Sequence, residues 1–298
     1  MMSFQFTQRS GIEKQVRSIA RGQISRALEA SYEPRGNLDD LVHQLRRRCK
    51  KLRGLVRLIE PRFKNAKREN RAFRDAAAGL AGRRDAAVMV ETFSQILEID
   101  LNRKGRPQIS ATQAKDILHS LQQAVGGPPD AVEATLLLRS FIEIFEAAKS
   151  RAGTWEISGK GFDQIGDGLE ATYRRMQTGL AVVERDASAE AIHAWRKDTK
   201  YHWHHVSLFV AAAPDTLTAR RHNLDRLGEW LGDHHNLAVL DATLADYPDI
   251  EAVRRVIAER QATLAADAIG LGRQLLAEKP NMLRERFERY WTLLPKKD

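Results

Sequence analysis

Six basic or ionisable side chains recur three and four residues apart within one short stretch of the sequence. They are His43, Arg46, Arg47, Lys50, Arg53 and Arg57. An α-helix turns by about 100° per residue, so all six would lie within about 80° of His43 on one face. Arginine donates two parallel hydrogen bonds to a phosphate group, and lysine adds a compact positive charge. The spacing therefore predicts a helix face that binds a molecule with repeated negative charge.

The opposite face of the same predicted helix is apolar. Its members are Leu45, Cys49, Leu52, Val56 and Ile59. One side should therefore be buried while the other stays available to a ligand. Like charges three and four residues apart destabilise a helix slightly, so we expect an anionic ligand to compensate for them. Arg48 and Lys51 fall between the two faces and are expected to be ordinary solvated charges.

The same spacing returns 150 residues later in the chain. Its members are His193, Arg196, Lys197, Lys200 and His204. Trp203 stands where the first stretch has Arg53, so the second stretch carries less fixed charge. Histidine has an ordinary pKa near 6.5 and would gain charge beside phosphates. We therefore expect binding to tighten as the pH falls, with contacts from both stretches.

Positive charge is concentrated rather than spread over the chain. Residues 43–74 hold 13 Lys or Arg and two acids, a local charge of +11 in a 298-residue chain whose net charge is +9. Such a focused charge attracts anions. We expect Arg71 and Arg74 to flank the same groove, and Tyr173 and Arg174, on the helix before the second stretch, to contribute donors to it.

The elements that must position these residues are helical throughout. Apolar residues recur at three- and four-residue spacing, and no alternating strand pattern stands out. The fold class predicted is all-α. The expected helices are 11–31, 38–59, 62–80, 83–101, 109–125, 129–151, 159–185, 187–212, 215–231, 233–245, 249–278 and 280–293.

Two internal matches at nearly equal offset indicate a duplicated helical unit. The two basic stretches are 150 residues apart, and the segment Leu80–Val88 loosely matches Leu231–Val239 at an offset of 151. We therefore interpret residues 1–298 as one domain built from two pseudo-symmetric helical bundles. The first half covers about 1–155 and the second about 156–298.

The two basic stretches together resemble the CHAD domain, the conserved histidine α-helical domain. The segment Leu227-Gly-Glu-Trp-Leu231-Gly-Asp233 is similar to a further motif of that family, and the resemblance covers nearly the whole chain. It implies two four-helix bundles with extra helices around a basic groove that binds inorganic polyphosphate. It also implies an association with polyphosphate granules. Trp203 and His204 depart from the family's more basic pattern, which leaves equal participation of the two halves open.

Catalysis is not expected from this sequence. It contains no phosphate-binding loop, no nucleophile elbow and no Glu-x-Glu-x-Lys signature of a triphosphate-hydrolysing tunnel domain. Acidic residues are scattered, whereas phosphoryl transfer needs acids that hold a cation. The histidine clusters at 202–205 and 234–235 lie beside arginines and lysines, and adjacent histidines on a helix point in different directions. We therefore expect no metal site and no cofactor, with a metal-dependent phosphate-processing enzyme as the alternative.

Nucleic acid is the secondary candidate partner. A basic helical protein can bind RNA or DNA through its phosphates, but aromatic residues make up only 7% of the chain and lie mostly on apolar faces. Membrane insertion is not expected, since no stretch approaches the 18 to 20 apolar residues that a span needs. A single cysteine and an N-terminal segment without an apolar core lead us to expect a cytoplasmic protein. The long predicted helix at 249–278 leaves the oligomeric state open.

Overall fold

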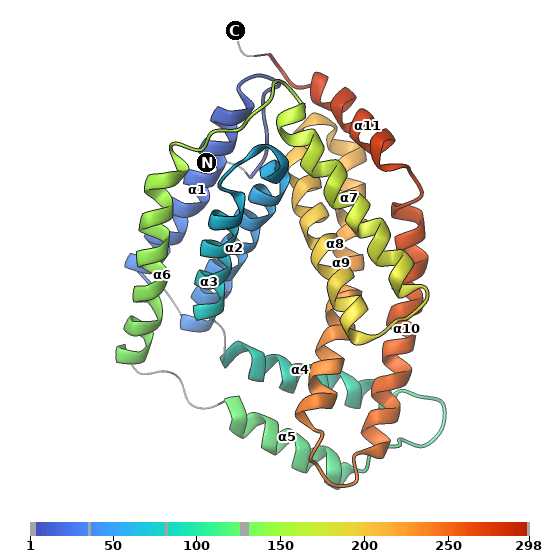
Figure 1. The fold of residues 1–298 in the computed structure, drawn as a ribbon. Coiled ribbons are helices and arrows are strands. Elements are labelled where there is room, and N and C mark those ends of the chain that lie inside the picture. Colours follow the sequence, from blue (N-terminus) through green and yellow to red (C-terminus); the bar gives the residue numbers. More distant parts are fainter. Residues whose placement is uncertain (1–3, 35–36, 81–82, 126–130, 297–298) are drawn as a thin grey trace.

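The computed structural model describes residues 4–34, 37–80, 83–125 and 131–296. The first helical bundle consists of four helices that pack side by side in the order α1, α2, α3, α6 (Figure 1). Their bounds are α1 Ile12–Tyr32, α2 Leu38–Ile59, α3 Ala66–Gly79 and α6 Ala131–Ala152. The apolar face of α2 supplies the centre of this bundle, because Leu45, Cys49 and Leu52 are fully buried.

The second bundle follows along the chain and has four helices with a fifth on its outside. Their bounds are α7 Asp163–Val183, α8 Ala189–Phe209, α9 Pro214–Thr243, α10 Glu251–Leu275 and α11 Pro280–Thr292. Neighbours in sequence are neighbours in space here: α7 packs on α8, α8 on α9 and α9 on α10, while α11 covers α7. Trp195 fills the centre of this bundle and is fully buried.

Two helices of the first sequence half lie against the second bundle. These are α4, Arg83–Leu101, and α5, Ala111–Val125, which pack on each other, while α4 also contacts α9 and α10 (Figure 1). They share a separate apolar cluster with α9 and α10, which includes Phe93, Ile117, Leu240 and Val253. The first half of the sequence therefore does not correspond to one spatial unit.

The bundles meet where α2 packs against α7 and α8. The contact is close because glycines stand at it. A Cβ at Gly54 of α2 would lie 2.7 Å from the Cβ of His204, and one at Gly168 of α7 would overlap the carbonyl of Leu58. His205 adds a hydrogen bond of 3.0 Å between Nε2 and the Gly54 carbonyl. From this contact α2 and α8 diverge toward α4 (Figure 1). The contact fixes the orientation of the two basic helices relative to each other.

The all-α prediction is confirmed: the described residues form eleven α-helices and two short 3-10 turns. The expected break between 231 and 233 is wrong, because α9 runs unbroken through Gly232. The duplication is not tested by these observations and stays a prediction. Among the described residues, no helix is long and apolar enough to cross a membrane.

Candidate functional site

The helix that carries the first basic stretch is fixed at both ends by its own sequence. The side chain of Asn37 accepts hydrogen bonds from the backbone N–H groups of Asp39 and Asp40, which caps the start of α2. Pro61 follows the last turn, where a proline cannot continue the helix. The six predicted side chains from His43 to Arg57 all remain partly or fully exposed, while the opposite face of α2 is buried. The predicted division of α2 into a basic and an apolar face is therefore observed.

Arg53 connects α2 to two of its neighbours, α3 and α8. Its Nε donates to the side-chain oxygen of Asn70 on α3 at 3.0 Å, and its Nη2 donates to the hydroxyl of Tyr201 on α8 at 2.8 Å. The guanidinium of Arg57 lies over the ring of Tyr201, 5.1 Å from its centre, and also pairs with Glu60. Tyr201 was not among the predicted site residues. Its position about 80° from His193 on the same helix is the signal that could have identified it.

Charges from both basic stretches act on Lys50. Desolvation lowers the pKa of its ammonium group, and so do the charges of Arg196, Arg46, Lys200 and Arg53; together they bring it to about 8. Two of these four residues belong to α8 of the second bundle. We call these five residues, Arg46, Lys50, Arg53, Arg196 and Lys200, the central basic cluster. The structure thus brings together charges that are up to 154 residues apart in the sequence.

Two glycines of α9 make room for the α8 members of the central basic cluster. A Cβ at Gly228 would lie 2.8 Å from Cε of Lys200, and a Cβ at Gly232 would lie 3.1 Å from Nε of Arg196. The glycines are four residues apart, as are the two cations, so both side chains lie across the same face of α9. Leu227 and Leu231, on the adjacent face, are buried in the core. This arrangement explains the Leu-Gly-x-x-Leu-Gly pattern in physical terms.

Acidic residues offset part of the positive charge on the α8 side. Nζ of Lys200 lies 3.1 Å from the carboxylate of Asp225 and 5.3 Å from the ring centre of Trp203. Burial lowers the pKa of Arg196, and the charge of Asp233 partly offsets that effect. On the α2 side, Arg53 donates to Tyr201 and Asn70, and Arg46 donates to the carbonyl of Leu80 at 3.4 Å. Lys200 and Arg196 on α8 are therefore each partly balanced by an acid of α9.

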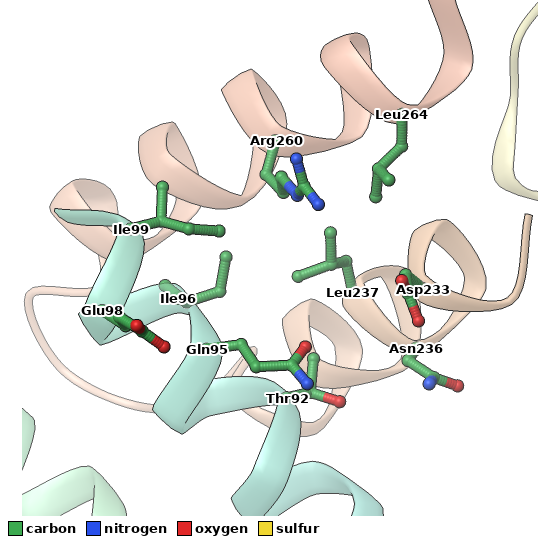
Figure 2. Close-up of a pocket in the computed structure, with 10 residues that line it drawn as sticks. All are labelled: Thr92, Gln95, Ile96, Glu98, Ile99, Asp233, Asn236, Leu237, Arg260 and Leu264. Carbon is green, nitrogen blue, oxygen red and sulfur yellow. The ribbon is translucent and has the colours of Figure 1, made fainter. Parts of the chain in front are cut away.

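Asp233 also borders a small pocket between α4, α9 and α10. The pocket measures about 200 Å³, and Figure 2 shows Arg260 and Asp233 along its wall with Gln95 and Thr92 opposite. Burial raises the pKa of Asp233, while Arg260 and Arg196 act in the opposite direction. Since the lining mixes apolar, acidic and basic side chains, this pocket lacks the concentrated positive charge that a polyanion needs.

The histidines of the two stretches have different surroundings. His43 is partly exposed on α2. The ring of His193 lies 4.2 Å from the ring of His235 on α9. Desolvation, followed by the charges of His235, Lys197 and Arg196, lowers the pKa of His193. Its surroundings without a ligand therefore favour the neutral ring, and the gain of charge beside a bound phosphate stays a prediction.

Two predicted ligand contacts are wrong because the side chains are buried. His204 lies against Gly54 at the contact between bundles, with the rings of Phe4 and Trp203 beside it, and is 6% exposed. Burial lowers its pKa well below the ordinary value. Tyr173 is fully buried, and its hydroxyl donates to the carbonyl of Glu278 at 3.0 Å. His204 therefore supports the contact between the two bundles, and Tyr173 supports the packing of the second bundle. The periodicity of a helix could not show this, because α7 and α8 are covered on more than one side.

The remaining predicted residues lie on the exposed surface. Arg47 and Lys197 are exposed on α2 and α8. Arg71 is exposed on α3, and Arg74 pairs with its neighbour Asp75 at 2.9 Å. Arg174 pairs with Glu170 one turn earlier on α7. These ion pairs are local, so Arg74 and Arg174 interact with their own helices and not with the central basic cluster.

Arg48 and Lys51 are not the ordinary solvated charges that the sequence predicted. Both are half-buried on the side of α2 that faces α1. Desolvation and the nearby charge of Arg26 lower the pKa of Arg48. Desolvation, followed by Arg47, Arg48 and Arg26, also lowers the pKa of Lys51. Finding this cluster required knowing that α1 lies beside α2.

The described residues contain no group of three or more His, Cys, Asp or Glu arranged to hold a metal ion. His202 and His205, which the sequence groups with His204, are fully buried in the second bundle. The carboxylate of Asp225 pairs with Lys200, and the carboxylate of Glu60 pairs with Arg57. The central basic cluster concentrates positive charge from α2 and α8, which attracts anions.

Comparison with known proteins identifies the family to which the chain belongs. No curated protein and no solved structure matches the chain. A family model described as CHAD domain matches residues 18–245, which include α2, α8 and the two glycines of α9. The match covers most of the 298 residues. The chain belongs to the CHAD domain family.

Proposed function

We propose that the central basic cluster binds inorganic polyphosphate and does not cleave it. The observation that carries this proposal is the environment of Lys50, whose pKa is lowered to about 8 by desolvation and by four cations from two helices. Like charges so close together repel one another, and a ligand with repeated negative charge relieves that repulsion. The family match supports phosphate as the source of that charge.

A linear polyphosphate suits this arrangement better than a single phosphate. The cations are spread along two helices that diverge from their contact, so one orthophosphate could reach only some of them. Successive phosphates of one chain can contact α2 and α8 at the same time. Linking the contacts in this way raises affinity without new chemistry. In this proposal α2 and α8 form the two sides of the groove that the sequence predicts.

The absence of cleavage is part of the proposal. Phosphoryl transfer needs a cation held by acidic residues. Asp225 is engaged in an ion pair with the cluster member Lys200, and the charge of Asp233 acts on Arg196. Incubation with polyphosphate and divalent metal ions, followed by an assay for released phosphate, tests this directly. Release above that of the heat-denatured protein would replace binding by hydrolysis as the function.

The binding experiment compares two double variants that remove equal charge. Arg46→Ala with Lys50→Ala removes two members of the central basic cluster. Lys64→Ala with Lys67→Ala removes two exposed lysines near the start of α3 and serves as the control. At about 1 kcal/mol or more for each charge-assisted contact, the first pair should weaken polyphosphate binding about 30-fold. The control should change it less than about threefold. Equal losses would show that net charge, and not this cluster, governs binding.

Competition with RNA at physiological salt separates polyphosphate from nucleic acid as the main partner. Both ligands carry phosphate charge, so both should lose affinity as salt rises. We expect polyphosphate to displace RNA at equal phosphate concentration. If RNA displaces polyphosphate instead, the central basic cluster is a nucleic-acid site. Granule association and a cytoplasmic location follow from the same proposal and are tested by imaging the tagged protein in cells that store polyphosphate.

A further inference from the structure

The pocket between α4, α9 and α10 carries charges of opposite sign on its wall. Arg260 lines it from α10 and Asp233 from α9, and Figure 2 shows the guanidinium of Arg260 pointing into the open space. Both side chains border one volume of about 200 Å³. In the part of the chain that the structure describes, neither of them forms a hydrogen bond or an ion pair. Each can therefore take a ligand group of the opposite charge.

Two neutral amides add further polar groups to this wall. Asn236 lines the pocket three residues after Asp233 on α9, and Gln95 lines it from α4 (Figure 2). Neither amide has a hydrogen-bond partner among the described residues. An amide side chain offers two N–H donors and one acceptor oxygen, so it can bind either end of a small polar molecule.

The inner wall of the pocket is apolar. Ile96, Leu237 and Leu264 line it, are 1%, 4% and 1% exposed, and belong to the apolar cluster that α4 and α5 share with α9 and α10. Gln95 and Glu98 are exposed, so the pocket opens to solvent on the side of α4. Its volume is below the roughly 300 Å³ of pockets that hold drug-sized molecules. The pocket therefore suits a small molecule with an apolar part and a charged part.

The carboxylate of Asp233 lacks a full counter-charge. Burial raises its pKa, and the charges of Glu229 and Glu91 act in the same direction, while Arg260 and Arg196 act against them. A ligand ammonium beside this carboxylate would compensate for its lost hydration. An anion without an ammonium would face Asp233 uncompensated, and a cation without a carboxylate would face Arg260. A molecule that carries both charges is therefore the best match.

We propose that this pocket binds a free amino acid with a small apolar side chain. The carboxylate of the amino acid pairs with Arg260, and its ammonium pairs with Asp233. Its side chain packs on Ile96, Leu237 and Leu264. The inference does not rest on polyphosphate binding, because no member of the central basic cluster lines the pocket.

The first test compares three ligands of similar shape by equilibrium dialysis. L-Valine carries both charges, isovalerate lacks the ammonium, and isobutylamine lacks the carboxylate. We expect L-valine to bind one saturable site with a Kd of about 1 mM or lower. The other two ligands should bind at least tenfold more weakly, since each loses one charge-assisted contact.

The second test removes one charge of the pocket at a time. Arg260→Gln should weaken L-valine binding about tenfold and leave isobutylamine binding no weaker than before. Asp233→Asn should do the same to L-valine and leave isovalerate binding no weaker than before. A structural collapse would instead weaken all three ligands in both variants. The matched controls are Arg255→Gln and Asp267→Asn, which change exposed residues of α10 outside the pocket and should stay within twofold of the unmodified protein.

Three outcomes would overturn the inference. L-Valine that fails to saturate the protein at concentrations up to about 10 mM, tenfold above the expected Kd, shows that the pocket holds only water. Isovalerate or isobutylamine that binds as tightly as L-valine shows that the pocket does not recognise both charges. Valine binding that Arg260→Gln and Asp233→Asn reduce no more than the controls places the amino acid elsewhere on the protein.

Discussion

The guanidinium of Arg53, on α2 of the first bundle, donates a hydrogen bond of 2.8 Å to the hydroxyl of Tyr201, on α8 of the second bundle. This bond joins the two basic helices at the side of the central basic cluster. It also keeps Arg53 extended between α3 and α8, where Asn70 accepts its other hydrogen bond. Arg53 is therefore oriented before any ligand arrives, and Tyr201 is the residue that orients it.

Replacing Tyr201 by phenylalanine tests this orientation. The substitution Tyr201→Phe removes the hydroxyl and keeps the ring that lies beneath Arg57. The free energy of unfolding should fall by about 1 kcal/mol, the usual contribution of one hydrogen bond. Polyphosphate affinity should fall about threefold, because Arg53 then loses part of its orientation. Chemical denaturation and a binding titration measure the two effects. Unchanged affinity would show that Arg53 does not contact the ligand.

Filling the space beneath Lys200 is a second test. In Gly228→Ala the new Cβ would lie 2.8 Å from Cε of Lys200, so that flexible side chain must move. The helix itself gains up to about 1 kcal/mol from the replacement of glycine by alanine. We therefore expect stability to be nearly unchanged and polyphosphate affinity to fall severalfold.

The control for this experiment is Gly270→Ala on α10, where a Cβ meets nothing within 4 Å. It should leave binding as it is and raise stability slightly. If both alanine variants bind polyphosphate like the unmodified protein, the position of Lys200 on Gly228 has no bearing on the site.

The lowered pKa of Lys50, about 8 in the free protein, predicts a specific pH dependence. Bound phosphates favour the charged ammonium and raise that pKa again, so binding above about pH 8 takes up a proton. Affinity should therefore decrease as the pH rises from about 8 to 10. The change should be smaller, about twofold, between pH 7 and 8, because a group with a pKa of about 8 is about nine-tenths protonated at pH 7 and half protonated at pH 8. Calorimetry in buffers of different ionisation heat measures the proton uptake.

The control for the pH experiment is Lys50→Arg, which keeps the positive charge throughout this range. Proton uptake near pH 9 should then disappear while binding remains. Uptake that persists in this variant would assign the titration to another group, and an affinity change confined to pH values below about 6.5 would assign it to a histidine.

Helical periodicity in the sequence predicted both the fold class and the basic face of α2. A helix face repeats every 3.6 residues, so the six residues from His43 to Arg57 could be placed on one side from spacing alone. Their apolar counterparts are indeed buried. The predicted break at Gly232 failed because glycine costs a helix only about 1 kcal/mol. The buried leucines on either side, Leu231 and Leu237, keep the segment helical.

Residues whose surroundings depend on a second or third helix could not be assigned in this way. His204 shares the spacing of the second basic stretch, yet Gly54 of α2 packs on it and excludes a ligand. Tyr201 was missed because its role depends on Arg53 of the other bundle. Lys51 was taken for a solvated charge because its basic neighbour Arg26 lies on α1. Spacing determines a face, and only packing determines what that face meets.

The account depends most on the claim that α2 and α8 hold the same ligand. Titration with a polyphosphate of about 20 units, a length chosen to reach both helices, tests this in the unmodified protein, Lys50→Ala, Arg196→Ala and the double variant. Retained helical content and unfolding transition exclude misfolding. We predict one binding site throughout, with each single substitution lowering its affinity about tenfold. Two independent sites, with each substitution abolishing one and leaving the other intact, would contradict the account.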